Sequence, residues 1–162
     1  MKIFNKVFTF LLLAFLINIS AQDINDTRFQ NIVKQLKLQP SKIHTDLCVE
    51  KKMPNWEDSY IVIIPILLGP LENDGFSVKN TILITDSKGL IKNKYTDSTE
   101  FGSDAIMLIS FTIDTGLYNL NSNIRAFGIS ANYTGSSKPN PYSASDISLY
   151  YPEQKTLNKI LD

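Results

Sequence analysis

The chain has 162 residues, with 16 basic and 16 acidic side chains and therefore no formal net charge at pH 7. This balance gives no electrostatic reason to expect a nucleic acid or an anionic membrane as partner. One histidine and one cysteine fall short of the three or four such ligands that a zinc site normally uses. No glycine-rich motif for phosphate or dinucleotide binding is present, so we expect no metal and no cofactor.

The N-terminus is typical of a secretory signal peptide. Lys2 and Lys6 precede an apolar run over residues 7–19, and small and polar residues follow it. The run is shorter than the roughly 20 residues that a membrane-spanning helix needs. We expect residues 1–21 to be removed near Ala21, which gives an exported protein, periplasmic or secreted, with no membrane span after cleavage.

The rest of the chain has the length of one domain. Apolar side chains recur at helical spacing from Phe29 to Leu36, and Pro40 is expected to stop this helix. We therefore predict an N-terminal helical segment over residues 22–40 and an antiparallel β domain over residues 41–162.

Strand patterns dominate after Pro40. The stretch "KIHTDLCVE" alternates apolar and polar residues, which predicts a strand with Cys48 buried. Pro65 interrupts the next apolar run and predicts an edge or a bulge, because proline has no amide hydrogen to donate. Further strands are predicted at residues 80–85, 90–95, 104–114, 123–133 and 146–151.

Turn residues punctuate these strands. The sequence Asp-Ser-Lys-Gly at residues 86–89 predicts a hairpin in which Gly89 takes a positive φ. Longer polar loops occupy residues 69–77 and 134–146. The pattern predicts a mainly β fold (α+β class), a single antiparallel β domain, sandwich-like or meander, with an N-terminal helix.

The most specific catalytic motif in the sequence is Asp-Thr-Gly at residues 114–116, the triplet of aspartic proteases. Such enzymes need two carboxylates that share one proton, so Asp114 would need a partner such as Asp104 or a second copy of the chain. Retroviral-type proteases carry a small residue after the glycine, whereas Leu117 follows here. We favour the alternative that the triplet closes a strand, since Asp and Gly form turns. No other catalytic constellation is evident, so a non-enzymatic role is preferred.

Arg125 lies within the apolar strand "NIRAFGI". A buried charge without a partner costs several kcal/mol, so we predict a structural ion pair with Asp114 or Asp104. The alternative is that Arg125 holds an anionic ligand.

Candidate binding residues lie in two polar, aromatic loops. Trp56, Glu57 and Asp58 precede a strand, and a tryptophan face beside carboxylates suits a sugar ring or a basic partner. The alternative is that Trp56 covers the open end of a β core. The second group is Tyr133, Asn140 and Tyr142.

Five short motifs follow one another in order: Ser-Asp-Ala (103–105), Ile-Asp-Thr (113–115), Arg-Ala-Phe-Gly (125–128), Gly-Ser-Ser (135–137) and Asn-Pro-Tyr (140–142). In this respect the chain resembles a family of uncharacterised Gram-negative exported proteins. The resemblance implies export and a β-rich domain, and no activity. Members of that family often have alanine where Gly116 stands and continue beyond the equivalent of residue 162, so this chain would be a shortened member.

The preferred interpretation is a small exported binding or inhibitor protein of immunity type, with an unknown protein or glycan partner in the bacterial envelope. The alternatives are a carboxylate-dependent hydrolase that uses Asp104 and Asp114, and a structural envelope component.

Overall fold

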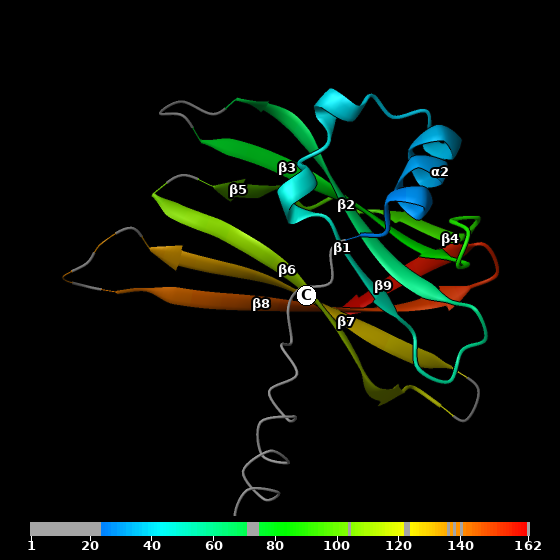
Figure 1. The fold of residues 1–162 in the computed structure, drawn as a ribbon. Coiled ribbons are helices and arrows are strands. Elements are labelled where there is room, and N and C mark those ends of the chain that lie inside the picture. The colour runs from blue at the N-terminus through cyan, green and yellow to red at the C-terminus, as the bar shows by residue number, and fades with distance from the viewer. Residues whose placement is uncertain are drawn as a thin grey trace, which may run out of the picture.

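The computed structural model describes residues 24–70, 75–103, 105–121, 124–135, 137, 139 and 141–161. The predicted signal peptide, Asp104 and Asn140 lie outside these residues. Within the described part, the fold is mainly β, with one mostly antiparallel sheet that closes into a near-barrel and a short helix near the N-terminus (Figure 1). The predicted fold class is therefore confirmed. The described part contains no helix long and apolar enough to cross a membrane.

The elements follow the chain in this order: α2 (Asp26–Leu36), η1 (Pro40–Lys42), η2 (Thr45–Leu47), β1 (Val49–Lys52), β2 (Tyr60–Pro70), β3 (Phe76–Thr85), β4 (Ile91–Thr96), β5 (Phe101–Ser103), β6 (Ile106–Asn119), β7 (Arg125–Gly135), β8 (Ser143–Glu153) and β9 (Thr156–Leu161). In the sheet, the strands lie in the order β1-β2-β3-β4-β9-β8-β7-β6, and β5 pairs with the start of β3. All pairs are antiparallel except β4 with β9.

The two ends of this strand order approach each other. Lys51 on β1 donates from Nζ to the carbonyl oxygen of Ile113 on β6, at 2.9 Å. Closer to the start of β6, Leu108 donates its backbone N–H to the Ser103 hydroxyl at 3.1 Å. These contacts bring β6 back to β1 and β5 and close that side of the near-barrel.

β2 is apolar on both faces because each face meets a different apolar cluster. Ile61 and Ile63 point into the interior, where they join side chains of β3, β6, β7 and β8. Val62 and Ile64 point outward and are covered by Ile32, Val33 and neighbouring residues. Alternate side chains of a strand face opposite sides of a sheet, so a strand buried on both sides reads as a continuous apolar run.

Helix α2 begins and ends with local caps. The Asn25 side chain accepts a hydrogen bond from the backbone N–H of Arg28 at 3.1 Å, so Asn25 is the N-cap. Lys37 takes a left-handed conformation with φ of 53° and ends the helix ahead of Pro40, which begins η1. The helix therefore ends at Leu36 with Lys37 as its cap, ahead of the predicted stop at Pro40.

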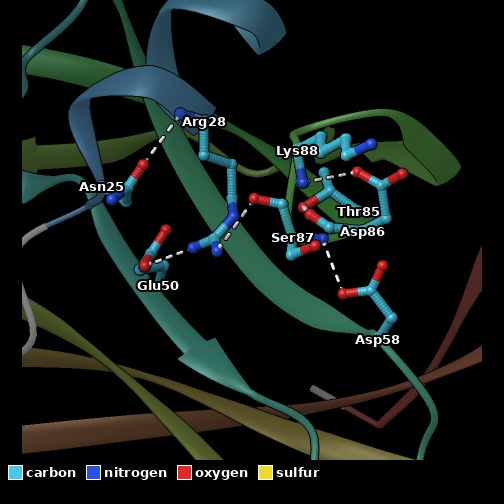
Figure 2. A network of polar contacts seen from close by, with 8 residues as sticks. All are labelled: Asn25, Arg28, Glu50, Asp58, Thr85, Asp86, Ser87 and Lys88. Carbon is cyan, nitrogen blue, oxygen red and sulfur yellow. Dashed lines mark hydrogen bonds and ion pairs between the residues drawn. The ribbon is translucent and has the colours of Figure 1, made fainter.

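A buried ion pair attaches α2 to the sheet. Arg28 pairs with Glu50 on β1, with 6% and 5% of the side chains exposed (Figure 2). The Arg28 guanidinium also lies over the ring of Tyr60, 3.7 Å from its centroid, and contacts the carbonyl oxygen of Ser87 at 3.4 Å. One side chain thus joins the helix, β1, β2 and the β3–β4 turn.

The predicted hairpin is present, with β3 and β4 joined by a turn in which Gly89 has a φ of 85°. The strand predicted around His44 and Cys48 is wrong. Ile43 makes an isolated bridge to Ile66 and the chain then forms η2. Cys48 is half-buried, and its thiol lies 3.7 Å from the carbonyl oxygen of His44.

Pro65 lies two residues past Ile63, where the pairing of β2 with β1 stops. Its carbonyl oxygen accepts the N–H of His44 at 3.0 Å, and the register of β2 against β3 shifts between Leu67 and Gly69. The position fits the edge or bulge that proline predicts.

Candidate functional site

The predicted binding residues divide between the two ends of the near-barrel. The antiparallel pairings place the β1–β2, β3–β4, β6–β7 and β8–β9 connections at one end, and the β2–β3 and β7–β8 connections at the other (Figure 1). Trp56, Glu57 and Asp58 lie at the first end, whereas Tyr133 and Tyr142 lie toward the second. The two groups of predicted binding residues therefore do not form one compact surface for a partner.

At the first end, the loop around Trp56 is part of the scaffold. Trp56 is half-buried and packs against the interior cluster, as the core-covering alternative predicts. Asp58 accepts the backbone N–H of Ser87 at 2.9 Å. The pKa of its carboxyl group is lowered first by a hydrogen bond from the Ser87 side chain and then by this backbone bond. The Asp58 carbonyl oxygen accepts from Lys92 Nζ at 2.7 Å. These contacts tie the loop to the β3–β4 turn, as Figure 2 shows for Asp58 and Ser87.

The Asp114 carboxylate is engaged within its own strand. It accepts a hydrogen bond from the Tyr118 hydroxyl and another from the backbone N–H of Gly116, at 2.8 Å. The Tyr118 bond is the main reason why the pKa of Asp114 is lowered. An aspartic protease needs a carboxyl group that holds a proton between two acidic residues, so these contacts favour a structural role for Asp114. The prediction that the triplet closes a strand is wrong, because β6 continues to Asn119 and the triplet lies at a register break within it.

The predicted ion pair between Arg125 and Asp114 is wrong. The Arg125 guanidinium instead donates to the carbonyl oxygens of Pro54 and Thr115, at 2.7 and 2.8 Å. Backbone carbonyls compensate the charge because Arg125 starts β7 beside the β1–β2 loop and the register break of β6. Asp104, the other predicted partner, is outside the described residues.

One hollow among the described residues lies at the second end, between β5 and β8. It has a volume of about 500 Å³, within the roughly 300–1,000 Å³ of small-molecule sites. We call it the β5–β8 trough and define it by its lining residues: Thr99, Glu100, Phe101, Tyr133, Ser145, Asp146, Ile147, Ser148 and Lys159.

The trough is an opening in the sheet. Among the described residues, β9 pairs with β8 from Leu149 onward, while β8 begins at Ser143. Figure 1 shows β9, in red, ending partway along the orange β8. The trough touches four consecutive residues of β8, 145–148, and successive side chains of a strand point to opposite faces. A hollow that meets both faces in this way runs along the edge of the strand.

Aromatic and acidic side chains share its walls. Tyr133 is half-buried, and burial followed by the charge of Asp146 raises the pKa of its hydroxyl. Phe101 is held edge-to-face on Phe111, with ring centroids 5.3 Å apart. Asp146 is exposed and forms no ion pair among the described residues.

A buried polar network supports the floor of the trough. Lys159 Nζ lies 3.7 Å from Asp97 Oδ1, and the Tyr150 hydroxyl donates to Asp97 Oδ2 at 3.0 Å. Asp97 is 2% exposed and Tyr150 is 1% exposed. Burial, followed by the charge of Asp97, raises the pKa of Tyr150. Lys159 is paired with Asp97, and Glu100 is paired with Lys79 at 3.2 Å. Asp146 is therefore the charged side chain of the trough that has no ion pair with another described residue.

Two other hollows carry less chemistry. One is the concave side of the β8–β9 turn, formed by residues 153–156. The other lies over the outer face of β6, β7 and β8, where Asn132 forms hydrogen bonds with Ser110, Thr112 and Ser145.

Sequence reasoning found Tyr133 in the trough and missed Asp146, Phe101 and Lys159. The alternation in "SASDISLYY" could have placed Asp146 on the same face as Tyr150. No pattern signals that residues 99–101 would lie across from β8. Among the described residues, no three metal-ligating side chains gather.

Comparison with protein-family models, with curated proteins and with solved structures finds no match. The predicted resemblance to a family of exported proteins therefore stays a prediction.

Proposed function

We propose that the mature chain is an exported binding protein and that its ligand occupies the β5–β8 trough. The observation that carries this proposal is the open edge of β8, which is flanked by Tyr133 and Phe101 and contains the uncompensated carboxylate of Asp146. Binding sites typically combine an apolar wall with a few placed polar groups, and this trough has that composition.

The rigidity of the walls also supports binding. Tyr133 and Asp146 belong to the β7–β8 pair, whose register runs without a break from Phe127↔Tyr150 to Thr134↔Ser143. Phe101 is fixed by Phe111, and the floor is fixed by the Asp97 network. Side chains that are already held in place lose little freedom when a ligand binds.

Catalysis has less support. Asp114 is occupied by Tyr118 and Gly116. The four ionisable groups that line the trough, Glu100, Tyr133, Asp146 and Lys159, include no nucleophile with an adjacent base. We therefore place the chain among binding proteins rather than hydrolases.

The proposal is tested by NMR titration of the ¹⁵N-labelled mature chain. Three separate pools serve as probes: neutral oligosaccharides, small aromatic amines and short peptides. We expect at least one pool to shift the amide resonances of residues 99–101 and 145–148, and Asp146→Asn to weaken that response.

Glu57→Gln is the matched control, because Glu57 is an exposed carboxylate at the opposite end. It should leave the response of the trough unchanged. Shifts confined to the β1–β2 loop, or no shift with any pool, would contradict the proposal.

A further inference from the structure

We infer that the ligand of the trough is an extended peptide segment of another protein, which adds as a strand to the free edge of β8 and places a basic side chain beside Asp146. This inference rests on the proposed function and specifies its ligand. Addition of a strand to an exposed sheet edge is a recurring mode of peptide recognition.

The width of the trough is set by the fold. Strands β4 and β5 pair with successive parts of β3, so they form one line on that side of the opening. Strand β9 lies between this line and β8, pairing with β4 at Lys94↔Thr156 and with β8 from Glu153↔Thr156 to Leu149↔Leu161. Beyond Leu149 the space that β9 occupies continues between residues 99–101 and β8, and this continuation contains the trough. We call the whole space, from β9 through the trough, the lane. A lane that holds β9 is one strand wide.

The backbone of β8 offers hydrogen bonds to this lane. The N–H of Gly135 donates to the carbonyl oxygen of Tyr142 at 2.8 Å, which marks a hydrogen-bonded pair of the β7–β8 ladder. Such pairs recur at every second residue, so residues 144, 146 and 148 direct their amides toward β7. Ser143, Ser145 and Ile147 therefore direct theirs into the lane, where the described chain provides no neighbouring strand.

The side chains of the lane select the peptide's pattern. On the interior side, Asp146 and Tyr133 provide a carboxylate and an aromatic face, which suit a basic side chain with an apolar stem. Glu100 adds a second carboxylate, although it already pairs with Lys79 at 3.2 Å. On the outer side, Ile147 is 39% exposed and suits an apolar neighbour. The lane thus matches a strand in which basic and apolar residues alternate.

The test uses blocked hexapeptides in titration calorimetry with the mature chain. One peptide alternates lysine with valine, and the other alternates glutamate with valine. We expect the lysine peptide to bind about tenfold or more tightly than the glutamate peptide, since one charge interaction of about 1.4 kcal/mol changes affinity tenfold. Asp146→Lys should reverse this preference, whereas Glu57→Lys, at the other end, should not.

A second pair of variants tests the strand geometry. Ile147→Pro removes an N–H that points into the lane and leaves the bonds to β7, so it should abolish binding, whereas Ile147→Val should bind as the wild type does. If Ile147→Pro fails to fold, lysine peptides N-methylated at every second residue provide the same test on the wild-type protein. One of the two methylation patterns should abolish binding and the other should not.

Equal binding of both methylation patterns, or no preference for lysine, would overturn the inference. So would a homodimer that Ile147→Pro dissociates in analytical ultracentrifugation, because the occupant would then be a second copy. Trough shifts with oligosaccharides or amines but none with the hexapeptides would reject the peptide and leave the proposed function standing.

Discussion

Arg28 of α2 and Glu50 of β1 form an ion pair inside the contact between helix and sheet, with about one-twentieth of each side chain exposed. Glu50 Oε2 and Arg28 Nε are buried without a hydrogen-bond partner among the described residues. Each charge therefore depends on the other for compensation. Removal of one charge is expected to destabilise the fold more than removal of both.

We predict that Arg28→Ala or Glu50→Ala lowers the free energy of unfolding by about 3–5 kcal/mol, because either change leaves a buried charge without its opposite charge. The double variant Arg28→Met with Glu50→Leu should lose much less, since no charge then remains. Urea denaturation of all three variants checks this. Lys79→Ala, which breaks the exposed pair with Glu100, is the control and should change stability by about 1 kcal/mol or less. A double variant as unstable as the single ones would refute the account.

Gly89 is the second place where α2 meets the sheet. A Cβ atom at this position would lie 2.7 Å from the carbonyl oxygen of Arg28, and its φ of 85° disfavours other residues. We expect Gly89→Ala to lower the free energy of unfolding by about 2 kcal/mol or more, measured by chemical denaturation. Gly102→Ala is matched to it, because nothing lies within 4 Å of a Cβ there. An equal decrease in the free energy of unfolding in both variants would show that the close approach of residue 89 to Arg28 does not limit stability.

The hairpin and the helix could be predicted from sequence because their signals are local. Gly89 closes a short turn, and the side chains from Phe29 to Leu36 repeat with the period of a helix. The pairing of β4 with β9 could not be predicted, since Lys94 and Thr156 meet through contacts distant in sequence. The trough exists because of that pairing, so its residues were mostly missed.

The error in predicting the partner of Arg125 has a related cause. The sequence places Asp114 on the neighbouring strand, and a carboxylate is the obvious partner for a guanidinium. The carbonyl oxygens of Pro54 and Thr115 compete for it, and carbonyl groups are present at every residue, so no sequence pattern reveals them. Asp114 in turn finds Tyr118 four residues later across a register break of β6.

Cys48 should be unreactive in the folded protein. Burial, followed by the charge of Asp46, raises the pKa of its thiol from 9.0 to about 12. Because the thiolate is the nucleophile, the reactive fraction at pH 8 is about a thousandfold smaller than for a thiol with the ordinary pKa. We predict very slow modification by iodoacetamide in native buffer and rapid modification in denaturant, followed by mass spectrometry. Rapid modification of the native chain would show that the site opens.

The Tyr118 hydroxyl holds the pKa of Asp114 below its ordinary value of 3.8. A carboxyl group whose pKa is lowered in the folded state stabilises the fold above its unfolded pKa, and this stabilisation is lost as the pH falls through the folded value. Tyr118→Phe should therefore raise the pKa of Asp114, seen by NMR of the carboxyl carbon. The stability difference between the variant and the wild type should be largest above pH 3.8 and should shrink in more acidic solution. A proton-sharing catalytic pair would behave in the opposite way, since one of its carboxyl groups has a raised pKa. Observation of a raised pKa for Asp114 in the wild-type protein would thus restore the protease interpretation that these contacts oppose.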